Sequence, residues 1–134
     1  SSDLSITIED TDKMSDADVD AAIRSAEKYS AQDRIRNEAM QMPPLGLIAA
    51  EEAERAMKLV EDQLEKEEKQ LIKRYVTELR VLCKRAKPDK MTAEEVEIFR
   101  EHIDRAANAS ARARLLAKEM DGAKDTEELK SIDE

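Results

Sequence analysis

Residues 49–86 read AAEEAERAMKLVEDQLEKEEKQLIKRYVTELRVLCKRA and contain neither glycine nor proline. Apolar residues recur in this stretch at steps of three, four or seven, which places them on one face of a helix. The positions between them are mostly Glu, Lys, Arg and Gln, which favour helices and keep the opposite face in water. The apolar stripe consists of Ala53, Met57, Val60, Leu64, Leu71, Tyr75, Leu79, Leu82 and Ala86. The sequence therefore predicts an all-α protein organised around this stretch.

One segment of the stretch, residues 65–70, carries no apolar side chain and reads EKEEKQ. A continuous helix over residues 49–86 would span about 55 Å at 1.5 Å per residue, and its stripe would need a partner chain. A turn in the charged segment would instead let two short helices pack within one chain. Neither Gly nor Pro enforces a turn there, so both alternatives stay open from these residues alone.

Composition narrows the class of protein. Apolar residues make up 40% of the 134 residues and aromatic residues only 2%, so the core must be aliphatic, which suits packed helices. The net charge of −9 argues against nucleic acid and against an anionic membrane surface as partners. The single cysteine, Cys83, excludes an internal disulfide and fits a reducing compartment, so we expect a cytoplasmic location. No apolar run approaches the length of a transmembrane helix.

The N-terminal region changes from a strand pattern to a helix start. Residues 4–8 read LSITI, an alternation typical of a strand, and a lone strand is unstable. We therefore expect residues 1–14 to be the end of a sheet that lies outside this chain, followed by a linker, and to be disordered here. Ser15 and Asp18 then form a capping box that opens a helix over residues 15–42.

Pro43 and Pro44 are expected to end that helix, because proline lacks an N–H and disfavours helical geometry in the residue before it. An apolar knot surrounds the two prolines. It is either a tight turn tucked between helices or an exposed patch that adapts to a partner. The knot consists of Met40, Met42, Leu45, Leu47 and Ile48.

A second capping box, Thr92 to Glu95, opens a last helix over about residues 92–120. Gly122 favours the end of this helix, and residues 123–134 are polar and weakly periodic, so we expect a frayed tail. The helix carries two apolar seams at heptad spacing. One consists of Val96, Ile103, Ser110 and Ala117, and the other of Phe99, Ala106, Ala113 and Met120.

No catalytic, cofactor or metal site is predicted. His102 is the only histidine, which makes a di-iron helical bundle impossible because such a site needs two Glu-x-x-His motifs. Cys83 lies on the apolar side of its helix and is interpreted as a small buried hydrophobe. The chain is therefore not expected to be an enzyme.

The N-terminal residues resemble a known family. The pattern Ile-Thr-Ile at residues 6–8, Met-Ser-Asp-Ala-Asp-Val at 14–19, Ala-Glu-Lys-Tyr at 26–29, then Asp33 and Arg36-Asn37 is similar to a junction in the DnaK-type seventy-kilodalton heat-shock chaperones. There, the last strand of the peptide-binding β-sandwich passes into the α-helical lid. The resemblance covers residues 6–39 and implies a lever helix over residues 15–42, a small antiparallel bundle over residues 43–122, and a turn at the charged segment. The lever and hinge residues that it implies are Val19, Ile23, Ala26, Tyr29, Asp33, Arg36 and Asn37.

The chain departs from the family pattern in three places. The Pro43-Pro44-Leu45-Gly46 segment interrupts the lever helix like an insertion, and Met40 and Pro44 occupy positions where the family has acidic and histidine residues that latch the lid. The last residues, 131–134, lack the tail motif of eukaryotic cytosolic members. The usual closing contact is therefore in doubt.

The function that this resemblance implies is that of a lid that covers the peptide groove and slows the release of unfolded client peptides. The implied partners are the β-sandwich domain and client polypeptides, with ATP and magnesium bound elsewhere in the parent chaperone and no cofactor in this chain. The alternative is a helical adaptor that self-associates as a coiled coil, and a homodimer of the isolated fragment is a further expectation. A compact monomer would favour the lid, and a concentration-dependent dimer would favour the adaptor.

Overall fold

The computed structural model describes residues 14–133, and all regular structure within them is helical. The elements are α2 (Asp16–Leu59), the short 3-10 helix η1 (Glu61–Gln63), α3 (Lys66–Arg85), the 3-10 helix η2 (Pro88–Lys90), α4 (Ala93–Ala109) and α5 (Ala111–Asp133). This confirms the predicted all-α class. The strand predicted at residues 4–8 lies outside the described residues. The chain divides into two compact units, Ser1–Arg34 and Ile35–Glu134.

In the first unit, the described residues form the beginning of α2. The helix starts as the capping box predicts, because the hydroxyl of Ser15 accepts a hydrogen bond from the backbone N–H of Asp18 at 3.1 Å. Asp16 and Asp18 place negative charge in the first turn, where the helix dipole favours it. Every side chain from residue 14 to residue 30 is exposed.

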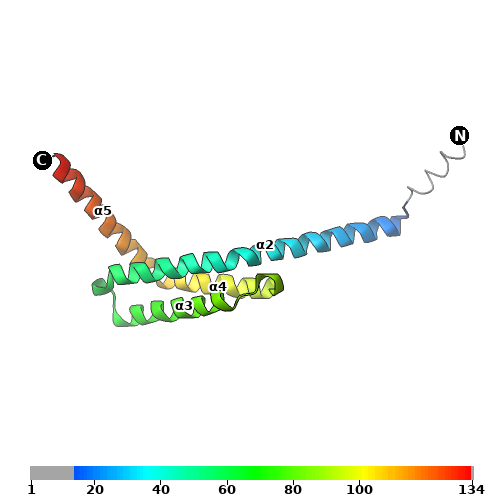
Figure 1. The fold of residues 1–134 in the computed structure, drawn as a ribbon, viewed down its shortest axis with the longest axis horizontal. Coiled ribbons are helices and arrows are strands. Elements are labelled where there is room, and N and C mark those ends of the chain that lie inside the picture. Colours follow the sequence, from blue (N-terminus) through cyan, green and yellow to red (C-terminus); the bar gives the residue numbers. More distant parts are fainter. Residues whose placement is uncertain (1–13, 134) are drawn as a thin grey trace, which may run out of the picture. The chain divides into compact units, whose positions relative to one another are not determined.

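The second unit is a small antiparallel bundle. Figure 1 shows α3 running back along the later part of α2, and α4 running back along α3. One apolar core joins these helices and the start of α5. The largest fully buried side chains are those of Phe99, Met42, Ile72, Leu79, Val60, Val96 and Ser110.

The open question over residues 49–86 is answered by a turn. Helix α2 ends at Leu59 and α3 begins at Lys66, so the apolar stripe closes within a single chain. The turn comes earlier than predicted: residues 60–65 form it, and most of the charged segment becomes the first turn of α3. Glu67 and Glu68 lie in that first turn, where negative charge is stabilised by the helix dipole.

The predicted stripe is right before the turn and partly wrong after it. Ala53, Met57, Val60 and Leu64 are buried as predicted. In α3, however, the buried residues are Ile72, Val76 and Leu79, whereas Leu71 is exposed and Tyr75 is only partly buried. Because the turn interrupts the helix, the spacing does not carry over from α2, and Ile72 and Val76 are buried in place of Leu71 and Tyr75. Leu79 is buried as predicted.

The prediction that Pro43 and Pro44 end a helix is wrong. Both prolines lie inside α2, which continues for fifteen residues beyond Pro44 to Leu59. Proline in a helix interior costs about 3 kcal/mol because it removes an N–H donor and crowds the preceding turn. The buried face on either side of the prolines offsets this cost by packing into the core of the bundle. That face consists of Ala39, Met42, Gly46, Ala50, Ala53, Ala56 and Met57.

The predicted last helix is divided at Ser110. Its two seams are largely buried as predicted, with Ile103 and Met120 partly buried. The buried hydroxyl of Ser110 donates to the carbonyl oxygen of Ala106 at 2.7 Å, a local bond that bends helices, and α5 begins at the next residue. Gly122 does not end the helix, since α5 continues to Asp133. Residues 121–132 are exposed, as expected of a tail without tertiary contacts.

Candidate interaction surfaces

The first candidate surface is the beginning of α2, where the resemblance implied lever and hinge residues. Val19, Ile23 and Tyr29 are all exposed, and the exposed fraction of Tyr29 reaches 68%. Ala26, Asp33, Arg36 and Asn37 are exposed as well. A row of apolar side chains without a covering element is typical of a binding face. The structure does not bring these residues together with any other site.

The second candidate surface is the apolar knot around the prolines, which proves to be neither a turn nor a uniform patch. Met42 is fully buried in the core, so it is not available to a partner. Met40, Leu45, Leu47 and Ile48 are each about half exposed on the other faces of the same helix. Because the helix continues through the prolines, successive side chains of the knot point to different sides of it. Met42 therefore faces the core, and the other four residues do not.

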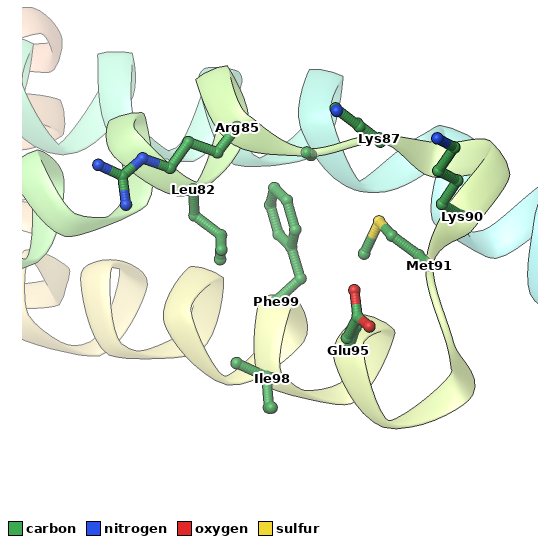
Figure 2. Close-up of a pocket in the computed structure, with 9 residues that line it drawn as sticks. Leu82, Arg85, Lys87, Lys90, Met91, Glu95, Ile98 and Phe99 are labelled. Carbon is green, nitrogen blue, oxygen red and sulfur yellow. The ribbon is translucent and has the colours of Figure 1, made fainter.

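The third candidate surface was not found from the sequence. It is a cavity of about 290 Å³ between the end of α3, the η2 connection and the start of α4. Figure 2 shows Leu82, Met91 and Phe99 facing the same space from these three segments. Its apolar lining consists of Leu82, Ala86, Met91, Ile98 and Phe99. Ile98 is 47% exposed, so the cavity opens to solvent beside it.

Charged side chains surround this cavity. Arg85, Lys87 and Lys90 line it from the α3 and η2 side, and Glu95 lines it from α4 (Figure 2). Within residues 14–133, none of the three cations takes part in an ion pair. The cavity was missed because its residues come from three elements, and only a cluster of bases in residues 84–90, KRAKPDK, signals it in the sequence.

Two residues singled out for their chemistry make structural contacts. The Cys83 thiol donates to the Pro43 carbonyl oxygen, and burial raises the pKa of this thiol above its ordinary value of 9.0. The Nδ1 atom of His102 lies 2.9 Å from the carbonyl oxygen of Ile98 in its own helix. Among the described residues, no group of three or more His, Cys, Asp or Glu side chains is placed to hold a metal ion.

An ion pair links α2 to α3. Arg80 of α3 approaches Glu54 of α2 to 2.5 Å, and Lys58 donates to the same carboxylate at 3.0 Å. The hydrogen bond from Lys58 and the nearby charge of Arg80 lower the pKa of Glu54, against the opposing effect of burial. The pair therefore holds α2 and α3 together while Glu54 is ionised.

The turn between α2 and α3 is tied to the start of α5. The guanidinium of Arg112 donates to the carboxylate of Glu68 at 2.7 Å and to the carbonyl oxygen of Gln63 at 3.4 Å. The second contact satisfies a backbone acceptor in the turn, where no side-chain cap is present. One arginine thus closes the end of the bundle at which three elements meet.

Comparison with known proteins finds a relative at the level of sequence. The chain is 32% identical over 84 residues to a protein of Saccharomyces cerevisiae named heat shock protein SSC3, mitochondrial. The chain is related to a heat-shock protein. The match covers 63% of this chain but only 13% of the length of that relative. It agrees with the resemblance of the N-terminal residues to the heat-shock chaperones.

The other comparisons give no match. No family model matches the chain, and no solved structure matches it. The relative is named as mitochondrial, so the expectation of a cytoplasmic location gains no support from it. Among the residues that the structure describes, no helix has the length and apolar character needed to cross a membrane.

Proposed function

We propose that this chain is the helical lid of a heat-shock chaperone. In this proposal the part of α2 that ends at Arg34 belongs to the lever, residues 35–122 belong to the bundle of the lid, and residues 1–14 belong to the end of the peptide-binding sandwich and a linker. The bundle covers the peptide groove of the parent protein and slows the release of unfolded client peptides. ATP and magnesium bind to another part of the parent, and the reaction with ATP takes place there.

The exposed apolar row at the start of α2 is the observation that carries the proposal. Val19, Ile23 and Tyr29 sit on a helix whose first turn is already capped by Ser15, so the helix is well started but its apolar face is uncovered. Burying one such side chain contributes about 1.5–3 kcal/mol. A sandwich domain that precedes this helix would supply the missing surface.

The bundle supplies the mechanical part of the proposal. Its helices share one apolar core and are joined by the Glu54–Arg80 and Glu68–Arg112 ion pairs, so we expect the packed part of the second unit to move as one body. A lid that controls access to a groove must be rigid and attached through a hinge. A small change of backbone angle at the hinge then moves the whole bundle away from the groove.

The experiment that tests this proposal measures peptide release from the parent polypeptide. A fluorescent client peptide is bound, an excess of unlabelled peptide is added, and the dissociation rate is recorded for the whole protein and for a version that stops after Arg34. Faster release from the shortened protein is the expected result. Equal release rates, or a parent polypeptide that contains no sandwich domain, would overturn the proposal.

The coiled-coil adaptor is not favoured by the structure. That alternative needs an apolar stripe that runs unbroken through residues 65–70 and is left open for a partner chain. The turn at residues 60–65 instead folds the stripe of α2 onto α3 and α4 of the same chain.

A further inference from the structure

The cavity at the end of α3 combines an apolar interior with an unpaired basic rim. The lid proposal makes no use of it. Its volume of about 290 Å³ lies just below the range for ligand pockets, about 300–1,000 Å³. That size suits one or two apolar side chains of a peptide better than a cofactor. Phe99 lines the cavity and is itself fully buried, so the cavity adjoins the core of the bundle.

The charge of the rim runs against the charge of the whole chain. The chain carries 32 acidic and 23 basic residues, yet residues 84–90 contain four bases and one acid. Lys84 and Arg85 lie in the last turn of α3, where the helix dipole favours cations. Lys87 and Lys90 lie beyond that helix, so the dipole of α3 does not account for them.

Three cations on one side of an apolar cavity specify the chemistry of the occupant. We propose that this cavity binds an acidic peptide segment of a partner protein, with a bulky apolar side chain of the peptide inserted against Met91 and Ile98. Its carboxylates lie along Arg85, Lys87 and Lys90. A single carboxylate, as in a fatty acid, would leave most of this rim unpaired, whereas a segment with several acidic residues pairs with all three cations.

Glu95 determines which wall of the cavity the acidic residues of the peptide can follow. It lines the cavity from α4, opposite the cationic side, and repels carboxylates from that wall (Figure 2). The acidic residues of the peptide must therefore follow the α3 and η2 side. Since the backbone N–H of Glu95 donates to the hydroxyl of Thr92, a Glu95→Gln change removes the charge and keeps the start of α4 intact.

The binding experiment uses the whole chain and a defined probe. A peptide of sequence Glu-Asp-Leu-Phe-Glu-Asp, labelled with a neutral fluorophore, is titrated with the protein, and fluorescence anisotropy gives the Kd. One control peptide replaces Leu and Phe by Ser, and another replaces the acidic residues by Asn and Gln. Saturable binding of the first peptide alone is expected. Equal binding of the serine peptide would overturn the proposal, because charge alone would then account for the complex.

Matched variants locate the site. The pair Lys87→Glu and Lys90→Glu is expected to raise the Kd at least about tenfold, whereas Lys124→Glu with Lys130→Glu makes the same change of charge on the exposed part of α5 and leaves it unchanged. Glu95→Gln is expected to lower the Kd. Equal weakening by both lysine pairs, or no saturable binding, would contradict the proposal.

The apolar half of the site has its own control. Ile98→Ser is expected to weaken binding, and Leu115→Ser, at an exposed position of α5, is expected to leave it unchanged. Sedimentation of the chain without peptide tests whether the occupant of the cavity is a second copy of this chain. If the Lys87→Glu and Lys90→Glu pair converts a dimer to a monomer, the occupant is a second copy of this chain and the proposal of a separate partner is wrong.

Discussion

The thiol of Cys83 in α3 donates a hydrogen bond to the carbonyl oxygen of Pro43 in α2, with 3.5 Å between sulfur and oxygen. This contact lies where the chain departs from regular helix chemistry, since Pro43 and Pro44 supply no N–H to the preceding turn. Gly46 lies one turn further on and lets the same sulfur approach the backbone of α2. The proline segment is therefore fitted to α3 and belongs to the core of the bundle.

Replacement of Gly46 by alanine is expected to destabilise the protein by about 1–3 kcal/mol. A Cβ atom at this position would lie 2.7 Å from Sγ of Cys83 and 2.8 Å from Cε1 of Phe99, closer than van der Waals contact allows, so one of these side chains or the backbone must shift. Gly122→Ala is the matched control. Nothing lies within 4 Å of its Cβ, so the better helix propensity of alanine should stabilise the protein by about 0.5–1 kcal/mol. Urea unfolding measures both, and a stabilising Gly46→Ala would refute the close packing.

Because the pKa of Cys83 is raised, its contribution to the free energy of unfolding decreases at alkaline pH. The folded thiol keeps its proton at a pH where the unfolded thiol, with an ordinary pKa of 9.0, has lost it. The stabilising contribution is thus fully present below pH 9 and is lost as the pH rises through the folded pKa. We expect the difference in unfolding free energy between the wild type and Cys83→Ala to shrink from pH 7 to pH 10. A constant difference would show that the thiol is not buried as described.

Because the pKa of Glu54 is lowered, its contribution to the free energy of unfolding decreases at acidic pH. Its stabilising contribution is present above the ordinary pKa of 4.5 and is lost as the pH falls through the folded value. Glu54→Gln is therefore expected to cost about 0.5–1 kcal/mol at pH 7 and nothing at pH 2. Glu78→Gln, which breaks a pair with Arg74 within α3, should cost less because it joins no two elements. Thermal unfolding from pH 2 to pH 7 measures the cost of each substitution. An equal cost of Glu54→Gln at pH 2 and pH 7 would contradict the prediction.

The two isoleucines Ile23 and Ile72 should respond to substitution in opposite ways. Ile23 is exposed, so Ile23→Ser is expected to change the unfolding free energy of the isolated chain by less than about 0.5 kcal/mol. Ile72 is fully buried, and Ile72→Ala is expected to cost about 2–5 kcal/mol. Chemical unfolding gives both values. A large loss from Ile23→Ser would mean that the start of α2 already has a partner within this chain.

The sequence predicted the helical class and the capping hydroxyls of Ser15 and Thr92, because caps are local and their hydrogen bonds form within four residues. It also predicted the two apolar seams of α4 and α5, because their heptad spacing is interrupted only at Ser110. It did not predict that α2 would pass through Pro43 and Pro44. Local preference argues against a helix there, and the packing of Met42 and Gly46 against distant residues decides the outcome.

The candidate sites were less predictable than the fold. Met42 was grouped with the other residues of the knot, because hydrophobicity alone does not say which face of a helix is covered. The cavity beside Phe99 was missed because its apolar lining and its basic rim come together only when α3 and α4 pack. By contrast, the row from Val19 to Tyr29, which is exposed in the structure, could be named from a resemblance.

Hydrogen–deuterium exchange of the isolated chain, recorded at low and at high protein concentration, tests the central claim most directly. The account predicts slow exchange within residues 39–58, 70–85 and 96–109, fast exchange at residues 60–65, and the same pattern at both concentrations. Continuous protection through residues 60–65, or protection of the bundle that disappears on dilution, would show that the apolar stripe is covered by a second chain and would contradict the account.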